Sequence, residues 1–172
     1  AYTFMFCHPG KKLLFMGQEF GQLREWSEER ELDWFLLSEE PHQQIQNWYR
    51  DLLHLYKKNP ALYELDNDPA GFEWINKDDI FRSIFSFVRH SKGKKKNLLF
   101  VCNFTPVARE DYGVGVPTKR QCKLVLNSDE KEYGGSGEKR TEIYKPVKKE
   151  CDGQKYSFAY PLPAYGVAVF EY

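Results

Sequence analysis

Polar and aromatic side chains that could bind a sugar lie close together between residues 17 and 34. The sequence reads GQEFGQLREW at 17–26 and LDW at 32–34. Amides and carboxylates form hydrogen bonds with hydroxyl groups, and flat aromatic faces cover the apolar C–H face of a pyranose. The candidate binding residues are Gln18, Glu19, Phe20, Trp26, Asp33 and Trp34. The same residues also fit a surface loop that is simply anchored by its two tryptophans.

Glu19 and Asp33 raise the question of glycosidase chemistry. A glycosidase needs a carboxylic acid and a carboxylate about 5–10 Å apart across the bond that is cleaved. Two carboxylates on one loop could meet this spacing, but a barrel enzyme normally draws its acids from the ends of several strands. We therefore do not favour this pair as catalytic.

The rest of the sequence contains no other familiar pattern of reactive groups. It has no Ser/His/Asp triad, no phosphate-binding glycine loop and no His/Cys metal cluster, so we expect no metal and no cofactor. The four cysteines lack CxxC spacing, which favours free buried thiols. The 25 basic and 25 acidic residues balance, which argues against a nucleic-acid partner or an anionic membrane. No apolar run reaches the ~20 residues of a membrane span, and we expect a soluble, cytoplasmic protein.

A strand, a loop and a helix are predicted to position the candidate residues. Residues 12–15 are a short apolar run typical of a buried strand in a parallel sheet, and residues 18–32 form a long loop after it. Ser38 is placed to cap the following helix, Pro41 lies in its first turn, and Asn59-Pro60 ends it. The apolar positions of this helix share one broad face: Ile45, Trp48, Leu52, Leu53, Leu55 and Tyr56. The strand, the loop and the helix together form one β/α unit, which cannot close a parallel sheet alone.

From about residue 71 the sequence becomes rich in short β-forming segments. The predicted strands are 72–75, 82–90, 97–105, 121–127, 141–145, 155–160 and 167–172. Their connections are rich in Gly, Pro, Asn and Asp, and the lysine-rich stretch 91–96 is expected to be a solvated hairpin tip. Within 97–105, Leu98, Phe100, Cys102 and Phe104 share one face. The pattern predicts a mainly β protein, an antiparallel β-sandwich.

The beginning of the chain is unusually apolar. Residues 2–6 are largely apolar and are followed by His8-Pro9-Gly10, which ends a helix. We interpret them as the last turns of a helix that starts before Ala1. An amphipathic start that docks on the domain is the alternative.

Several segments resemble the bacterial-type 1,4-α-glucan branching enzymes of the α-amylase superfamily, glycoside hydrolase family 13. They are HPGKKLLFMGQEFGQLREW, LDW, ALYELDNDPAGFEWI, SFVRH, VCNFTPVAREDYGVGVP and LPAYGVAVFEY, and they span essentially the whole chain. The REW…LDW pairing and the NFTP segment are fairly specific for this family. The resemblance implies that residues 1–65 are the last strand, loop and helix of a (β/α)8 barrel. Residues 66–172 are then the carboxyl-terminal all-β sandwich domain.

The resemblance also implies an activity for the parent protein. The family forms α-1,6 branches in glycogen by retaining transglycosylation, with a nucleophilic Asp, a Glu acid and a third, stabilising Asp. No residue of this chain matches those three motifs, so we expect no catalytic residue here and an inactive fragment. The six candidate residues then lie on the rim of the barrel mouth, with α-glucan as the partner; Glu19 could equally hold that rim together.

Two alternatives and one physical expectation remain open. The chain could be a non-catalytic glucan-binding or structural β-module, which would need exposed aromatics such as Tyr112, Tyr133, Tyr144, Tyr156 and Tyr160. It could also belong to a debranching relative, although REW…LDW counts against this. Without its barrel partners, the apolar face of the helix and of residues 13–15 should pack on the sandwich, dimerise or stay disordered.

Overall fold

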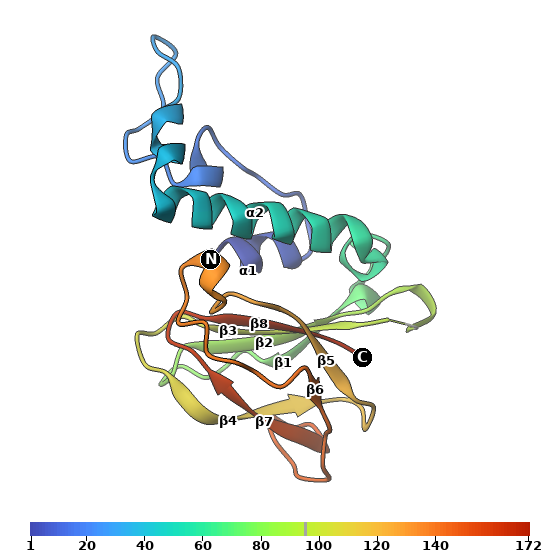
Figure 1. The fold of residues 1–172 in the computed structure, drawn as a ribbon. Helices are drawn as coiled ribbons and strands as arrows, with labels where there is room; N and C mark the ends of the chain where they lie inside the picture. Colours follow the sequence, from blue (N-terminus) through green and yellow to red (C-terminus); the bar gives the residue numbers. More distant parts are fainter. Residues whose placement is uncertain (95) are drawn as a thin grey trace.

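The computed structural model describes residues 1–94 and 96–172 and has three layers (Figure 1). Two helices, α1 (Tyr2–Cys7) and α2 (Glu40–Lys58), form the first layer. They cover one face of a six-stranded sheet, and a two-stranded sheet covers the other face. The hairpin tip predicted at 91–96 includes Lys95, which lies outside the described residues.

The six-stranded sheet is antiparallel, with strand order β1-β2-β3-β8-β5-β6. Its strands are β1 (Phe72–Asn76), β2 (Ile84–Arg89), β3 (Leu98–Asn103), β5 (Cys122–Asn127), β6 (Ile143–Tyr144) and β8 (Val167–Glu171). The second sheet pairs β4 (Arg109–Val116) with β7 (Tyr156–Leu162), also antiparallel. The predicted antiparallel β-sandwich is therefore confirmed.

Strand β3 shows why the sheet is covered on both sides. All six of its residues are buried. Leu98, Phe100 and Cys102 belong to the core under the helices, as their predicted common face requires, whereas Leu99 and Val101 belong to the core between the sheets. Alternate residues of a strand point to opposite faces, so β3 contributes to two hydrophobic cores at once.

Strand β4 was not predicted, although the seven predicted strands are all present. Its sequence, REDYGVGV, begins with charged residues and contains two glycines, which weaken a strand pattern. The fold needs a glycine at 115, because an added Cβ would lie 2.4 Å from the carbonyl oxygen of Cys151. The close approach of the Cys151 backbone thus explains why residue 115 is a glycine, and this glycine is one reason why the sequence pattern did not indicate a strand.

The buried strand predicted at 12–15 is wrong. Residues 11–15 form no regular element, and the side chains of Leu13 and Phe15 are 68% and 47% exposed. A strand is stable only when a neighbour accepts its backbone hydrogen bonds, and no described residue pairs with this segment. Dimerisation through this exposed surface stays a prediction. In the predicted loop that follows, residues Gln18–Phe20 form a short 3-10 turn, η1.

Helix α2 (Glu40–Lys58) begins one residue later than predicted, with Glu39 rather than Ser38 at the cap position. Ser38 does not cap it, because its Oγ donates to the carbonyl oxygen of Phe35 at the end of a second 3-10 turn, η2 (Trp34–Ser38). Pro41 does lie in the first turn, and the helix ends before Asn59 as expected. The Asn59 amide side chain donates to the carbonyl oxygen of Leu55 and so satisfies one of the last helical acceptors.

The apolar face of α2 packs on the sandwich, which is one of the three outcomes expected for a helix without its barrel partners. Leu52 is fully buried in the core that also contains Phe100 of β3 and Phe6 of α1. Trp48 contacts the ring of Tyr133, edge to face, with centroids 4.9 Å apart. Residues 2–7 do form a helix, and it docks on the same core. The division between residues 65 and 66 therefore remains a prediction, because one hydrophobic core crosses it.

A buried arginine ties the helical layer to the sheet. Arg89, at the end of β2, has a fully buried side chain that donates to the carbonyl oxygens of Cys7, Leu62 and Gly71 at 2.7, 3.2 and 3.3 Å. It also forms an ion pair with Asp66 at 2.7 Å. No local pattern in the sequence indicates this role, because the four acceptors are spread along the chain from residue 7 to residue 71.

The remaining expectations concern thiols, metals and membranes. All four cysteines are free: Cys7, Cys102 and Cys122 are buried, and Cys151 is partly exposed. Burial raises the pKa of Cys122 to about 12, which keeps this thiol protonated and unreactive at neutral pH. Within residues 1–94 and 96–172, we find no group of three acidic, His or Cys side chains that could hold a metal, and no helix suited to crossing a membrane.

Candidate functional site

The candidate residues lie on a segment that we call the rim segment, residues 17–34. Its first part, η1, is bounded by two glycines in the left-handed region, Gly17 with φ 85° and Gly21 with φ 67°. A side chain at 17 would also collide with Gln22, whose Cβ would lie 2.8 Å from the added Cβ. The two glycines of the GQEFG motif therefore serve the turn itself.

The first turn of α2 holds the rim segment in place. Phe20 is fully buried, and the Nδ1 of His42 lies 2.7 Å from its carbonyl oxygen, to which the ring donates. Gly21 lies against Ile45, because an added Cβ would be 3.6 Å from a methyl group of that side chain. Thus α2, rather than a barrel strand, is the element that supports η1 in this chain.

An arginine–carboxylate clamp closes the long loop. The Nε of Arg24 donates to one carboxylate oxygen of Asp33 at 2.8 Å, and its Nη2 donates to the other. Gln22 reinforces both ends: its Oε1 accepts from the backbone N–H of Asp33 at 2.7 Å, and its Nε2 donates to the carbonyl oxygen of Arg24 at 3.0 Å. Because Arg24 engages both oxygens of Asp33, this carboxylate positions the loop instead of facing a ligand.

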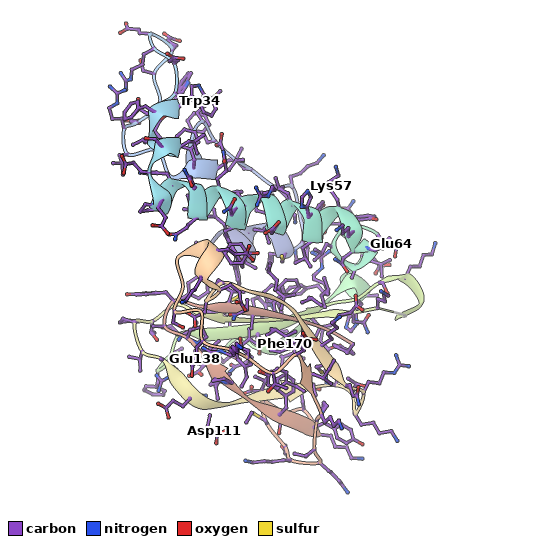
Figure 2. The ribbon with its side chains drawn as sticks, in the orientation of Figure 1. Trp34, Lys57, Glu64, Asp111, Glu138 and Phe170 are labelled. Carbon is purple, nitrogen blue, oxygen red and sulfur yellow. The ribbon has the colours of Figure 1, made fainter. Side chains whose placement is uncertain are left out.

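The two tryptophans remain the open aromatic surfaces of the rim segment. Trp34 is 48% exposed and rests on Phe20 with ring centroids 5.1 Å apart. Trp26 is 39% exposed and meets Phe15 edge to face at 5.6 Å. Figure 2 shows Trp34 at the end of the helical layer that points away from the sandwich, where Phe170 and Asp111 lie.

The structure thus separates the six candidates into three groups. Trp26 and Trp34 present flat surfaces, whereas Phe20 and Asp33 are buried supports. Gln18 is exposed, and its Oε1 accepts from the backbone N–H of Phe15 at 3.1 Å; Glu19 is half-buried. Arg24, which was not among the six candidates, is the residue that orders the loop.

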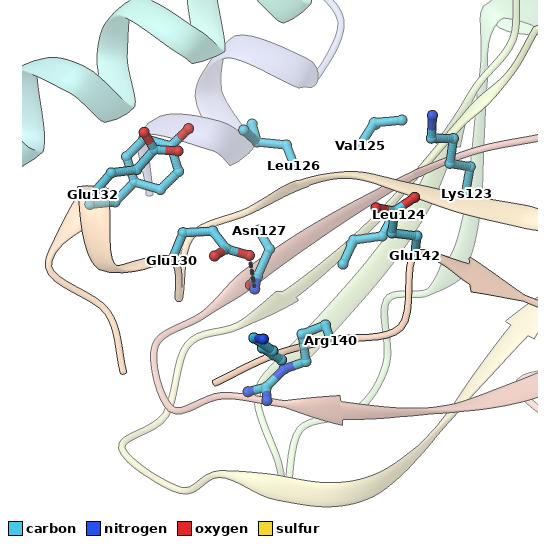
Figure 3. Close-up of a pocket in the computed structure, with 11 residues that line it drawn as sticks. Lys123, Leu124, Val125, Leu126, Asn127, Glu130, Glu132, Arg140 and Glu142 are labelled. Atoms are coloured by element: carbon cyan, nitrogen blue, oxygen red, sulfur yellow. Dashed lines mark hydrogen bonds between the residues drawn. The ribbon is translucent and has the colours of Figure 1, made fainter. Parts of the chain in front are cut away.

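A second region with site-like features lies between β5 and residues 130–142 (Figure 3). This hollow has a volume of about 560 Å³ and is lined by none of the six candidates. Figure 3 shows Glu132 toward the helical layer and Arg140 toward the sandwich strands, with a hydrogen bond between Asn127 and Glu130. Next to this hollow, Asp129 anchors the loop by accepting hydrogen bonds from Ser136 and Arg140.

The Arg24–Asp33 clamp should lower the measured pKa of the Asp33 carboxyl group. Hydrogen bonds from Arg24 hold the pKa of Asp33 below the usual aspartate value. A depressed pKa in the folded state means that the clamp contributes its stabilisation above the unfolded-state pKa and loses it as pH falls through the folded value. In a carboxyl-detected NMR titration, we expect the Asp33 midpoint below the normal range, and Arg24→Met should return it toward that range. An unchanged midpoint in this variant would show that another group sets the pKa.

Comparisons with known proteins match this chain along its whole length. Residues 74–172 match the family described as "Alpha amylase, C-terminal all-beta domain". A 1,4-alpha-glucan branching enzyme of Butyrivibrio fibrisolvens is 52% identical over 172 residues, covering 100% of this chain and 27% of that protein. Branching enzymes of Clostridium perfringens strain 13 and Aquifex aeolicus are each 44% identical, covering 98% and 99% of this chain and 25% and 27% of those proteins.

The chain therefore spans about a quarter of the length of these curated relatives. Among solved structures, a MUTB mutant soaked with trehalulose has a TM-score of 0.52 at 13% identity, covering 82% of this chain and 20% of that one, which supports the fold alone. The resemblance to branching enzymes seen in the sequence motifs is confirmed by these relatives. By its match over residues 74–172, the chain belongs to the family of the alpha amylase C-terminal all-beta domain.

Proposed function

We propose that this chain serves as the carboxyl-terminal part of a 1,4-α-glucan branching enzyme. One observation carries the proposal: the relatives named as branching enzymes align over 98–100% of the chain, through the helical layer as well as the sandwich. The family match alone, which begins at residue 74, would fit many enzymes with the same β domain. The alignment with branching enzymes also extends through the preceding 73 residues, which contain REW…LDW, and this favours branching enzymes over a debranching relative.

In this proposal the parent enzyme transfers a segment of α-1,4-glucan to a 6-hydroxyl group, with retention at the anomeric carbon. An Asp nucleophile, a Glu acid and a stabilising Asp act on barrel strands that are not represented among these 172 residues. Residues 1–65 then belong to the end of the (β/α)8 barrel. The exposed apolar side chains of Leu13 and Phe15 support this, because neighbouring barrel strands would bury such a surface.

The rim segment would guide the glucan at the mouth of that barrel. Trp26 and Trp34 offer half-exposed rings suited to the apolar face of a glucose unit. The role of Asp33 would be indirect, since its clamp with Arg24 fixes the backbone immediately before Trp34. None of these residues would take part in bond cleavage, so the chain by itself would not form branches. For the whole protein we propose α-glucan as partner and the cytoplasm as location.

The alternative of a self-contained glucan-binding β-module is not favoured by the positions of its tyrosines. Tyr112 and Tyr160 are buried in the core between the two sheets, and Tyr144 and Tyr156 pack against that core. Tyr133 packs on Trp48, and its hydroxyl donates to Asp51 at 2.8 Å. These rings serve the fold, so the exposed aromatic row that such a module needs does not form from them.

A linkage assay tests the proposal. Residues 1–172 incubated with amylose should leave the iodine absorbance and the content of α-1,6 linkages unchanged. The protein encoded by the complete reading frame should produce new α-1,6 linkages, and that frame should encode three acidic barrel motifs upstream of the Ala1 codon. Branching by the 172-residue chain, or a complete frame that lacks these motifs, would contradict the proposal.

A further inference from the structure

Three segments far apart in the sequence enclose a hollow at one end of the sandwich. Residues 108–110 lie at the start of β4, residues 129–140 form the loop after β5, and residues 161–164 lie at the end of β7. The hollow has a volume of about 330 Å³. This lies at the lower end of the range for small-molecule sites, roughly 300–1,000 Å³, and suits one or two sugar rings better than a peptide.

The polar wall of this hollow is fixed in advance. Asp129 accepts from the backbone N–H and the Oγ of Ser136 at 2.9 and 2.5 Å, which folds the loop back on itself. It also accepts from Arg140 at 3.0 Å, and the other terminal nitrogen of Arg140 contacts Glu138 at 2.6 Å. The Arg140 side chain is only 5% exposed, so its guanidinium is held in one orientation. A site whose groups are already ordered loses little entropy when it binds a ligand.

Two buried donors around the hollow lack acceptors among the described residues. They are the Nε atoms of Arg109 and Arg140, both of which line the hollow. The buried hydroxyl group of Tyr160 lies beside the Arg140 side chain. Buried N–H groups are almost always paired in folded proteins, so these two donors are available to a group in the hollow that accepts hydrogen bonds.

The charges around the hollow indicate what kind of group this is. Arg109 and Arg140 bring two positive charges, and Asp129, Glu138 and Glu110 bring three negative ones. An anion would meet a slightly negative site, and a cation would meet the buried guanidinium of Arg140. A neutral molecule with hydroxyl groups can accept from the two Nε atoms and donate to the carboxylates.

The remaining wall is apolar. Pro161, Leu162, Pro163 and Ala164 line this side. A pyranose ring has the matching pair of surfaces, a rim of hydroxyl groups and a C–H face. We propose that this hollow binds a short segment of α-glucan, through the unpaired Nε atoms of Arg109 and Arg140 and the apolar wall at 161–164. The choice of α-glucan among sugars rests on the proposed function, whereas the preference for a neutral hydroxylated ligand does not.

Amide NMR shifts of the 172-residue chain titrated with maltotriose test this site. We expect saturable shifts at Glu110, Glu138 and Ala164. Arg109→Met removes one orphan donor and should weaken binding about tenfold. Arg120→Met is its matched control: this exposed arginine lies outside the hollow, and its loss should leave binding unchanged.

A second variant tests the same hollow without changing Arg109. Ala164→Trp should fill the hollow and abolish the shifts, while Ala159→Trp on the exposed face of β7 should not. Shifts confined to Trp26 and Trp34, saturable shifts with inorganic phosphate but not with maltotriose, or no shifts at 110, 138 and 164 would each overturn the assignment. Such a failure would leave the linkage assay of the complete protein unaffected, so the two proposals fail separately.

Discussion

Replacing Arg89 with methionine is expected to lower the free energy of unfolding by about 3–5 kcal/mol, the usual cost of removing one partner of a buried ion pair. Methionine keeps much of the apolar stem but leaves the carbonyl oxygens of Cys7, Leu62 and Gly71 without their donor. It also leaves Asp66 without its cation, and the Asp66 side chain is only 20% exposed. Chemical denaturation followed by tryptophan fluorescence would measure the loss.

A matched surface pair controls for the removal of a positive charge. Arg50 lies 3.8 Å from Asp51 and its side chain is 56% exposed, so Arg50→Met should cost about 0–1 kcal/mol. If the two arginine variants proved equally stable, the buried network around Arg89 would not be what holds the helical layer on the sheet. Because the acceptors of Arg89 come from α1, from the segment after α2 and from the turn just before β1, its loss should weaken all three attachments.

Truncating Leu52 to alanine is expected to cost about 2–5 kcal/mol, because it opens a cavity between α2 and the sandwich. Leu52 is fully buried among Phe6, Phe100 and Val169, which belong to three different elements. Its neighbour Leu53 is 38% exposed, so Leu53→Ala should cost well under half as much and provides the matched control. Equilibrium denaturation of both variants gives the comparison.

The same two variants test whether the helical layer and the sandwich unfold together. The core that contains Leu52 is shared by residues on both sides of position 65, so we expect a single transition whose midpoint shifts for Leu52→Ala. A second transition that appears only in this variant would mean that residues 1–65 form a separate unit. That result would favour the division into 1–65 and 66–172 over the continuous core.

The sequence predicted the elements whose signals are local. Alternating apolar residues, turn residues at regular spacing and a proline after Asn59 were sufficient for seven strands and for the end of α2. The error at the start of α2 is small: Ser38 forms a hydrogen bond within η2, immediately before the helix that it was expected to cap. Local patterns succeed because the period of a strand or helix is set by the residues within it.

The strand predicted at 12–15 failed for the opposite reason. Its apolar residues indicate burial, but burial in a sheet depends on neighbouring strands, and no described segment supplies them. Strand β4 was missed because Gly113 and Gly115 look unfavourable in a strand until Cys151 is seen to pass directly over them. For β4, the deciding contact comes from a residue far away along the chain, which a local pattern cannot show.

For the candidate site, the sequence by itself determined the residue types: two tryptophans, polar side chains and glycines at the turn positions of residues 17–34. Only the tertiary structure decided their roles. Both carboxylate oxygens of Asp33 accept hydrogen bonds from Arg24, Phe20 is buried beneath Trp34, and the faces of the two tryptophans stay partly exposed. It also brought together Arg89 with its four acceptors, and Arg109 with Arg140 around one hollow. Residue types limit which contacts are chemically possible, but the path of the folded chain determines which of them form, because partners tens of residues apart meet only after the layers have packed.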